Sequence, residues 1–253
     1  MMFFVIALIV IAGGYFLFRK GKPSVVNTES DLLSYKNLLN QEVDFYKKLD
    51  INSKSRFETL VFEFLNDVRI EGVGTDVTDK DRTLIASSAI IPVFGFPEWK
   101  YKNLTNVILY PDTFDKDFQF EGGSRNIMGM VGTGYMNGQM LLSRGALTKG
   151  FSSSAGKENA AIHEFIHLLD KSDGATDGVP ENLFAHEYAV PWLKMMHQEM
   201  RRIEDGKSDI NPYALTNEAE FLAVASEYFF EKPEKFERMH PELFKMLNRI
   251  FNI

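Results

Sequence analysis

The chain has 253 residues, of which 45% are hydrophobic and 25% are charged, and this is an ordinary composition for a globular protein. Its formal net charge of -7 argues against a basic surface for a nucleic-acid backbone, so we expect protein or peptide partners and no nucleic acid. The absence of cysteine excludes disulfides, thiolate catalysis and cysteine-ligated zinc, so any metal ion must be held by His, Asp or Glu.

An uncharged apolar run, MMFFVIALIVIAGGYFLF, precedes the basic sequence RKGK. At about 1.5 Å per helical residue the run spans about 27 Å, close to the hydrocarbon thickness of a bilayer. The positive charge that should precede a signal peptide and the cleavage site that should follow it are both missing. We therefore predict a transmembrane anchor over residues 1–20, with everything downstream kept in the cytoplasm, at the inner membrane, by the basic residues after the run. The alternative is an N-terminal helix packed on the domain.

A linker is predicted over residues 21–30, with a helix-capping signal at its end, and a domain over residues 31–253. Apolar residues at helical spacing predict helices over 31–50 and 55–70. A third helix is expected to follow an N-cap at Thr78 and to end near Pro92.

Two strands are predicted next, over residues 106–111 (NVILYP) and 138–143 (GQMLLS). The glycine-rich stretch between them is interpreted as loop and hairpin, because no helix follows it at the spacing of a phosphate-binding loop. Beyond residue 157 the pattern is nearly all helical. These elements predict an α+β fold, mostly helical with a small mixed sheet.

The sequence AAIHEFIHLLDKSDG places His163 and His167 one helical turn apart, with Glu164 beside the first. Residues four apart lie on one face of a helix, so both imidazoles can reach one metal ion. Glu164 is then placed to accept the proton of a water molecule at the metal. The alternative is a structural histidine pair, but the apolar residues around the motif indicate a helix with a large buried surface.

Two imidazoles leave a tetrahedral zinc ion short of a protein ligand. The segment YALTNEAEFLAVASEYFF is a predicted helix over residues 213–230, and it places Glu220 and Glu227 two turns apart on one face. One carboxylate would bind the metal and the other would orient a ligand imidazole, and the spacing leaves open which does which. Solvated helix glutamates are the alternative. Asp170 is interpreted either as a partner of the His163 ring or as the end of its helix.

The other three histidines are weaker candidates for metal ligands. His186, His197 and His240 lie in amphipathic helical contexts without partners at ligand spacing. We interpret them as surface or core residues, which is the commoner role of an isolated histidine.

Four stretches together resemble the Mlc titration factor A family of glucose-regulated metallopeptidases. They are VTDKDRTLIASSAIIPVFGFPEW, NVILYPDTF, HEFIHLLDKSDGATDGVP and YALTNEAEFLAVASEYFFEKP, and the resemblance covers most of residues 31–253. It implies a zincin-like metallopeptidase domain whose catalytic core is similar to that of anthrax lethal factor. The best-known family member is soluble, and the apolar run of this chain departs from it.

The resemblance also implies roles for individual residues. His163, His167 and Glu220 would hold one zinc ion, Glu164 would be the general base toward a zinc-activated water, and Glu227 would orient a ligand histidine. Tyr213, seven residues before Glu220, would stabilise the oxyanion. In zincins the substrate peptide lies along a sheet edge above the active helix, and the strand GQMLLS is the edge we expect.

The expected function is therefore that of a membrane-anchored zinc metallopeptidase. A second hypothesis is a membrane-tethered regulatory protein that binds a transcriptional regulator or another protein, with minor or absent peptidase activity, because a soluble member of the family sequesters a repressor of sugar uptake. A third is a metal-dependent hydrolase that acts on a non-peptide bond. The glutamate beside the two histidines favours catalysis, since a binding module would not need it.

Overall fold

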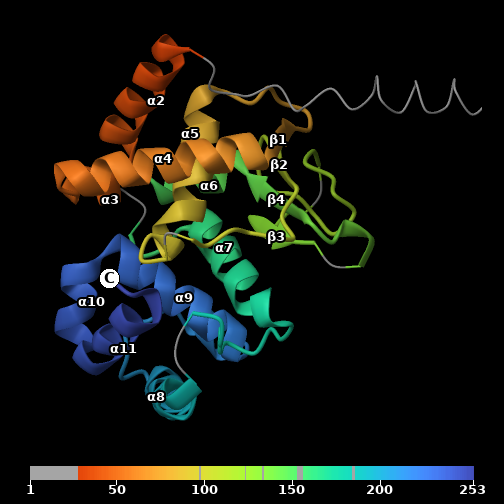
Figure 1. Ribbon diagram of the computed structural model, residues 1–253. Coiled ribbons are helices and arrows are strands. Elements are labelled where there is room, and N and C mark those ends of the chain that lie inside the picture. Colours follow the sequence, from red (N-terminus) through yellow and green to blue (C-terminus); the bar gives the residue numbers. More distant parts are fainter. Residues whose placement is uncertain (1–27, 97, 123, 133, 153–155, 184–185) are drawn as a thin grey trace, which may run out of the picture.

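The computed structural model describes residues 28–96, 98–122, 124–132, 134–152, 156–183 and 186–253 (Figure 1). The predicted membrane anchor over residues 1–20, and most of the predicted linker, lie outside these ranges. Within them, no helix combines the length and the apolar character that crossing a membrane requires.

The described chain is mostly helical, with one small mixed sheet, as predicted. The helices are α2 (Glu29–Glu42), α3 (Asp44–Lys48), α4 (Ile51–Asp67), α5 (Asp79–Ile90), α6 (Arg144–Gly150), α7 (Ala160–Asp170), α8 (Ala189–Glu204), α9 (Glu218–Glu231), α10 (Pro233–Met239) and α11 (Pro241–Phe251). The strands are β1 (Arg69–Gly72), β2 (Asn106–Tyr110), β3 (Gly129–Val131) and β4 (Gln139–Ser143). Short 3-10 turns include η1 (Ile91–Val93), η3 (Lys171–Asp173), η4 (His186–Tyr188) and η5 (Pro212–Leu215).

The first two predicted helices differ in detail from the observed ones. The segment 31–50 forms two helices, because the β-branched Val43 adopts an extended backbone (φ -112°, ψ 99°) between α2 and α3. The next helix, α4, ends at Asp67 rather than at residue 70. Ile70 instead lies in β1 and pairs with Val107 of β2. The predicted helix included this residue, because the apolar spacing of the preceding residues is helical.

The third predicted helix begins where the sequence indicates. Thr78 caps α5 by accepting a hydrogen bond from the backbone N–H of Asp81, whose side chain in turn accepts from Thr78. The helix ends at Ile90 and continues as the 3-10 turn η1 over Pro92. The predicted N-cap and end of this helix are therefore confirmed.

The sheet has the order β1-β2-β4-β3. β1, β2 and β4 are parallel, and β3 is antiparallel to β4. The prediction that the strand at 138–143 forms the edge is wrong, because β4 lies between β2 and β3. The outer strands are β1 and β3. β3 comes from the glycine-rich stretch, and Figure 1 shows it beside α7.

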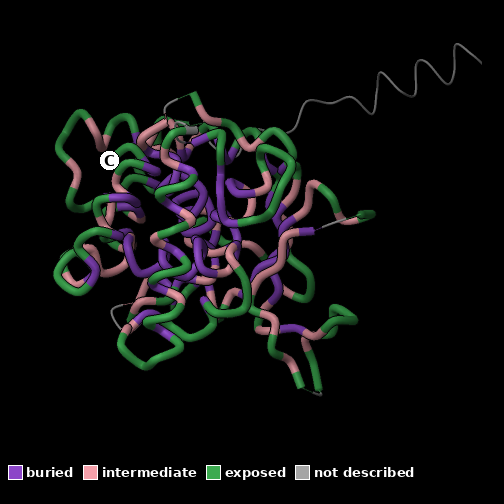
Figure 2. The backbone as a smooth tube through the Cα atoms, turned by 90° about the horizontal axis from the view of Figure 1, so that it is seen from below, coloured by how far each residue is buried: buried purple, intermediate pink, exposed green. Residues whose placement is uncertain are grey.

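Alternation along the strands gives the sheet two buried faces. One face contributes Val107 and Leu109 to the large core shared with the helices. The other face carries a smaller cluster built on Tyr110, Phe114 and Leu141. In Figure 2 the buried segments gather at the centre of the molecule and exposed loops outline it. The large core thus fixes the sheet against the helices that carry the candidate site.

The C-terminal part is helical, as predicted, and α7 packs directly against α9. The predicted helix over 213–230 begins later, at Glu218, because the side chain of Asn217 caps it by accepting from the N–H of Glu220. The residues before Asn217 form the turn η5. Tyr213 therefore approaches the site from a turn and not from α9.

Candidate metal centre

Helix α7 places its two histidines on one side. Asn159 caps this helix by accepting from the N–H of Ile162, and the opposite face packs into the core. His163 and His167 are one turn apart, and their ring centroids lie 4.7 Å from each other. The residues of α7 buried in the core are Ala161, Ile162, Phe165, Ile166 and Leu169. Burial of that face leaves the imidazoles directed toward α9.

Helix α9 supplies a carboxylate to the same point. The Oε2 atom of Glu220 lies 3.0 Å from Nε2 of His163 and 3.4 Å from Nε2 of His167. The two Nε2 atoms are 3.0 Å apart. The structure therefore brings His163, His167 and Glu220 together, with one donor atom from each within 4.8 Å of the others.

These separations fit a tetrahedral divalent cation. Ligand bonds of about 2.0–2.1 Å at tetrahedral angles separate the donor atoms by about 3.3 Å. The three observed separations of 3.0, 3.0 and 3.4 Å lie close to that value. Two imidazole nitrogens and a carboxylate oxygen are also a donor set that zinc prefers.

Glu227 lies on the other side of the His163 ring. Its Oε1 atom is 2.7 Å from Nδ1 of His163, and its Oε2 atom accepts the backbone N–H of Asn159 at 2.5 Å. When Nδ1 donates its proton to Glu227, the lone pair of Nε2 faces Glu220. Of the two glutamates whose roles the sequence left open, Glu220 lies with both histidines where it could share a metal ion with them, and Glu227 lies at Nδ1 of His163.

The electrostatic surroundings of His163 favour a cation. Burial lowers the pKa of His163, but hydrogen bonds to Glu220 and Glu227 outweigh it and raise the pKa to about 10. The pKa of Glu220 is lowered to about 2, because hydrogen bonds to His163 and His167 outweigh its burial. The same carboxylates that hold a proton on His163 would attract a divalent ion.

Glu164 is a buried carboxyl group beside this set. It is 8% exposed, and burial raises its pKa above the ordinary value, although the neighbouring His163 and His167 oppose the rise. Its side chain packs against β3 at Gly129, where an added Cβ atom would lie 2.6 Å from Cγ of Glu164. Sequence patterns did not predict this contact, because β3 is short and lies in a glycine-rich stretch.

Asp170 does not contact His163. As the last residue of α7 it accepts the backbone N–H of Gly178 at 3.0 Å, and burial raises its pKa to about 6. Of the two interpretations of Asp170, the end of the helix is the one that the structure matches. Within the described residues, Nδ1 of His167 has no hydrogen-bond partner, so the two histidines are held differently.

Tyr213 stands at the rim of the site. Its ring centroid is 6.1 Å from that of His163, and its side chain is 53% exposed. Burial and the charges of Glu220 and Glu164 raise the pKa of its hydroxyl, which keeps the hydroxyl protonated at neutral pH. A protonated hydroxyl at this position can donate a hydrogen bond to a bound group.

Comparison with known proteins gives the family. The sequence profile of the glucose-regulated metallo-peptidase M90 family matches residues 20–252. The chain belongs to this family. Membership in the M90 family implies a metal ion, and the set His163, His167 and Glu220 is a possible site for it.

Relatives of this M90 protein match most of its length. An uncharacterized protein of Synechocystis is 27% identical over 85% of this chain and 82% of its own. Mlc titration factor A of Pectobacterium atrosepticum is 27% identical over 78% of this chain and 77% of its own. Mlc titration factor A of Cronobacter sakazakii is 32% identical over 68% of each chain. The resemblance to the Mlc titration factor A family is therefore confirmed.

Two other histidines of the M90 chain have acidic partners distant in sequence. His197 is paired with Glu218 at 3.1 Å on the surface. His240 is 3% exposed and faces Oε1 of Glu199 at 3.0 Å and Oδ1 of Asp209 at 2.9 Å. Sequence spacing does not predict these acidic partners, because they lie in elements that only the fold brings next to the histidines. The side chain of His186 lies outside the described residues.

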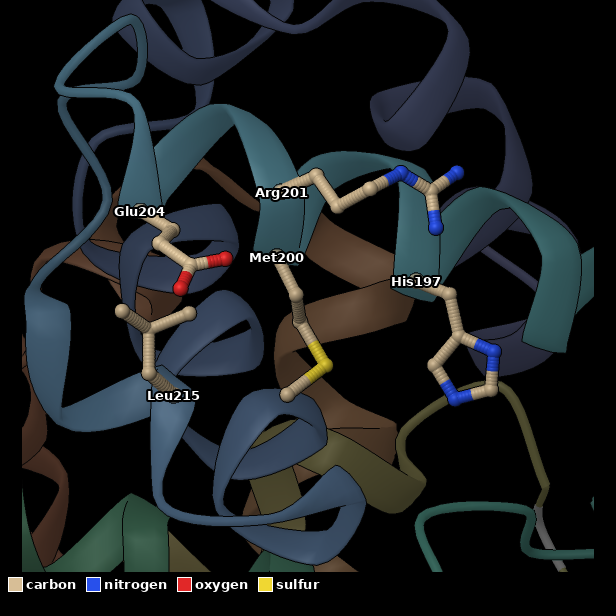
Figure 3. Close-up of a pocket in the computed structure, with 5 residues that line it drawn as sticks. All are labelled: His197, Met200, Arg201, Glu204 and Leu215. Carbon is tan, nitrogen blue, oxygen red and sulfur yellow. The ribbon is translucent and has the colours of Figure 1, made fainter.

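A separate hollow of about 330 Å³ lies between α8 and η5 (Figure 3). Its lining comprises His197, Met200, Arg201, Glu204 and Leu215. The figure shows four of these side chains on α8 and Leu215 on the facing segment. None of the three candidate metal ligands lines this hollow.

Proposed function

We propose that this protein is a zinc-dependent peptidase of the zincin type. The observation that carries the proposal is the set of three donor atoms, with a buried glutamate next to it on the same helix. His163, His167 and Glu220 would hold the ion. A zinc ion held there would act as a Lewis acid toward water and the substrate carbonyl.

The residues around the ion have separate tasks in this proposal. Glu164 would accept a proton from the attacking water and return it to the leaving amide nitrogen. Its raised pKa brings it closer to neutrality, where proton transfer in both directions is efficient. The hydroxyl of Tyr213 would donate a hydrogen bond to the developing oxyanion, an interaction typically worth a few kcal/mol in the transition state. Glu227 would keep the His163 ring oriented.

The outer edge of β3 supports a peptide as the substrate: Phe114 pairs with this edge at Ile127, and no described residue pairs with it at Gly129 or Val131. Met130 lies opposite Leu141, and the neighbouring pairs that join Gly132 to Gln139 and Met128 to Ser143 are hydrogen-bonded. In an antiparallel pair the intervening residues direct their N–H and C=O groups outward. Gly129 and Val131 therefore offer backbone hydrogen bonds to an added strand beside Glu164.

The test compares the full chain with Glu164→Gln. The amide cannot accept the proton, so we expect turnover of a mixed peptide library to fall by about 1,000-fold or more, while the zinc content stays near one ion per chain. Zinc is measured by elemental analysis of the purified proteins. Equal peptidase activity in both forms would show that Glu164 is not the base.

The name of the relatives favours a second function. Several relatives are called Mlc titration factor A, and this chain is 27–32% identical to them. We propose that binding a transcriptional regulator accompanies the peptidase activity. Co-purification of such a regulator with both the wild-type chain and Glu164→Gln would separate binding from turnover, since only turnover requires the base.

We also propose that residues 1–20 anchor the chain in the inner membrane, with the remainder in the cytoplasm. The support is the uncharged apolar run and the basic residues Arg19 and Lys20 that follow it. A charge in the middle of the run, as in Leu8→Arg, costs about 2.5–3.5 kcal/mol of insertion free energy. We expect the wild-type chain to remain with membranes after an alkaline wash, and a measurable fraction of Leu8→Arg to be released.

A further inference from the structure

A cavity of about 430 Å³ lies at the far end of the edge strand β3. It is bounded by Val131 and Gly132 on one side, by Leu168 and Lys171 on another, and by the segment 98–104. None of the three candidate metal ligands lines it. The proposed catalytic mechanism makes no use of this cavity.

The cavity is within reach of a peptide bound at the site. Leu168 directly follows the candidate ligand His167, and Gly132 lies three residues beyond Gly129, which contacts Glu164. At about 3.3 Å per residue of extended chain, three residues cover about 10 Å. A peptide paired with β3 would therefore place a side chain in the cavity two or three residues from the bond next to Glu164.

The direction in which a bound peptide would run along β3 follows from the relative stability of antiparallel and parallel strand pairing. Antiparallel pairing is slightly more stable than parallel pairing, and β3 runs from Gly129 toward the cavity at Gly132. An antiparallel peptide would run from the cavity toward Glu164. The residue in the cavity then lies on the amino-terminal side of the scissile bond.

The charged residues of the cavity lining are mostly basic, although the chain as a whole is acidic. The chain as a whole has a net charge of -7, yet the lining contains three lysines and a single acidic residue, Glu98. Lys100 already pairs with Asp67 at 3.3 Å. Among the described residues neither Lys102 nor Lys171 forms a salt bridge.

Lys171 is the best-placed of these cations. Its Nζ atom reaches the carbonyl oxygen of Gly132 at 3.5 Å, so the ammonium group lies at the junction of the cavity and β3. A carboxylate that entered beside β3 would meet this ammonium group in a partly enclosed space, where an ion pair is stronger than at an open surface. An amide or a second cation would gain less there.

We propose that this cavity binds an acidic side chain of the substrate, two or three residues on the amino-terminal side of the scissile bond. This inference rests on the proposed peptidase function and names its substrate class. The site would recognise peptides by the aspartate or glutamate at that position.

The test uses quenched fluorescent peptides in which one glutamate is moved along an otherwise neutral sequence, each matched by a glutamine peptide. For the full zinc-loaded chain we expect kcat/KM to be at least about fivefold higher for glutamate than for glutamine at the cavity position only. Lys171→Met should remove the preference, and Lys171→Glu should favour lysine at that position. Lys245→Met, on α11 and outside the cavity, should retain it.

Binding of the same peptides to Glu164→Gln, measured by fluorescence anisotropy, separates this inference from the proposed function. Cleavage by the wild-type chain without any preference for glutamate would overturn the cavity assignment and leave the peptidase proposal intact. Binding that prefers glutamate and depends on Lys171, without cleavage by the wild-type chain, would support the cavity and overturn the peptidase proposal. Absence of both would overturn both.

Discussion

At the residue scale, the contact between β3 and the proposed base makes Gly129 a positioning residue. A methyl group at this position would lie 2.6 Å from Cγ of Glu164, so Gly129→Ala must displace the carboxyl group. We expect peptidase activity to fall by about 10- to 100-fold, because small misplacements of a reacting group have effects of this size. Zinc content should not change.

The control for this prediction lies on the same strand. Met130 packs on the opposite face of the sheet, in the cluster of Tyr110, Phe114 and Leu141. Met130→Ala should lower the melting temperature and leave the rate per folded molecule close to that of the wild type. Full activity in Gly129→Ala would show that Glu164 tolerates the added methyl group or does not act as the base.

The hydrogen bond between Glu227 and His163 gives a second prediction. Glu227→Gln removes the charge that strengthens the 2.7 Å contact with Nδ1. We expect zinc affinity, measured by competition with a chelating dye, to fall by about 10- to 100-fold. Glu218→Gln, on the same helix but paired with the exposed His197, should have the affinity of the wild type. An unchanged zinc affinity in Glu227→Gln would show that the charge of Glu227 does not contribute to zinc binding.

At the element scale, Asn159 joins the two helices that carry the candidate ligands. It caps α7, its backbone N–H donates to Glu227, and its side chain donates to Oε1 of Glu231 at 2.8 Å. Asn159 is fully buried, so these interactions are shielded from water. The start of α7 is thereby held against the second half of α9.

We therefore expect Asn159→Ala to lower both stability and metal affinity. Loss of the cap costs about 1 kcal/mol of unfolding free energy, and the half-buried Glu231 would lose its donor as well. Thr28→Ala removes a matched cap from α2, far along the chain from the candidate ligands. Urea denaturation and zinc titration of both variants should show a stability loss in each, with weaker zinc binding only in Asn159→Ala.

Prediction from sequence succeeded where the signal was local. The cap at Thr78, the strand at β2 and the one-turn spacing of His163 and His167 each depend on residues close in the chain. It failed at β1 and β3, whose identity as strands depends on pairing with distant residues. The position of Glu227 beside Nδ1 of His163 likewise depends on how α9 packs against α7, which spacing alone leaves undetermined.

At the scale of the whole molecule, the buried His240 contributes a pH-dependent part of the stability. Burial lowers its pKa, but contacts with Glu199 and Asp209 outweigh burial and raise it above the usual value of 6.5. Hydrogen bonds to Lys157 and His240 outweigh burial and lower the pKa of Asp209. A raised histidine pKa stabilises the fold fully below the unfolded value and less as the pH rises through the folded one. The lowered aspartate pKa stabilises it above the unfolded value of 3.8.

The two contributions overlap at about pH 5–6. We expect His240→Gln to lower the free energy of unfolding most in this range, and progressively less at alkaline pH as His240 of the wild type loses its charge. Chemical denaturation of both proteins at a series of pH values measures the difference. A difference that is constant from pH 5 to pH 10 would mean that the charge on His240 does not contribute.

Metal binding should also stabilise the whole molecule, because a ligand that binds only the folded state shifts the unfolding equilibrium. Zinc at 100 times its dissociation constant should add about 2.7 kcal/mol to the free energy of unfolding, and a chelator should remove it. Glu220→Gln should show little response to either. Differential scanning calorimetry measures these shifts, and an equal response of the wild type and Glu220→Gln would exclude Glu220 as a ligand.

The outer position of β3 has a consequence for regulation. Beside Glu164, β3 has no further strand partner in the part of the chain that the structure describes, so its outer edge can accept one extended segment at a time. A protein that docked by adding its own strand there would occlude the substrate, so a regulator bound in this way and a peptide awaiting hydrolysis would compete. Such a regulator would inhibit by occupying the same edge, more completely as its concentration rises, without any change in the shape of the protein.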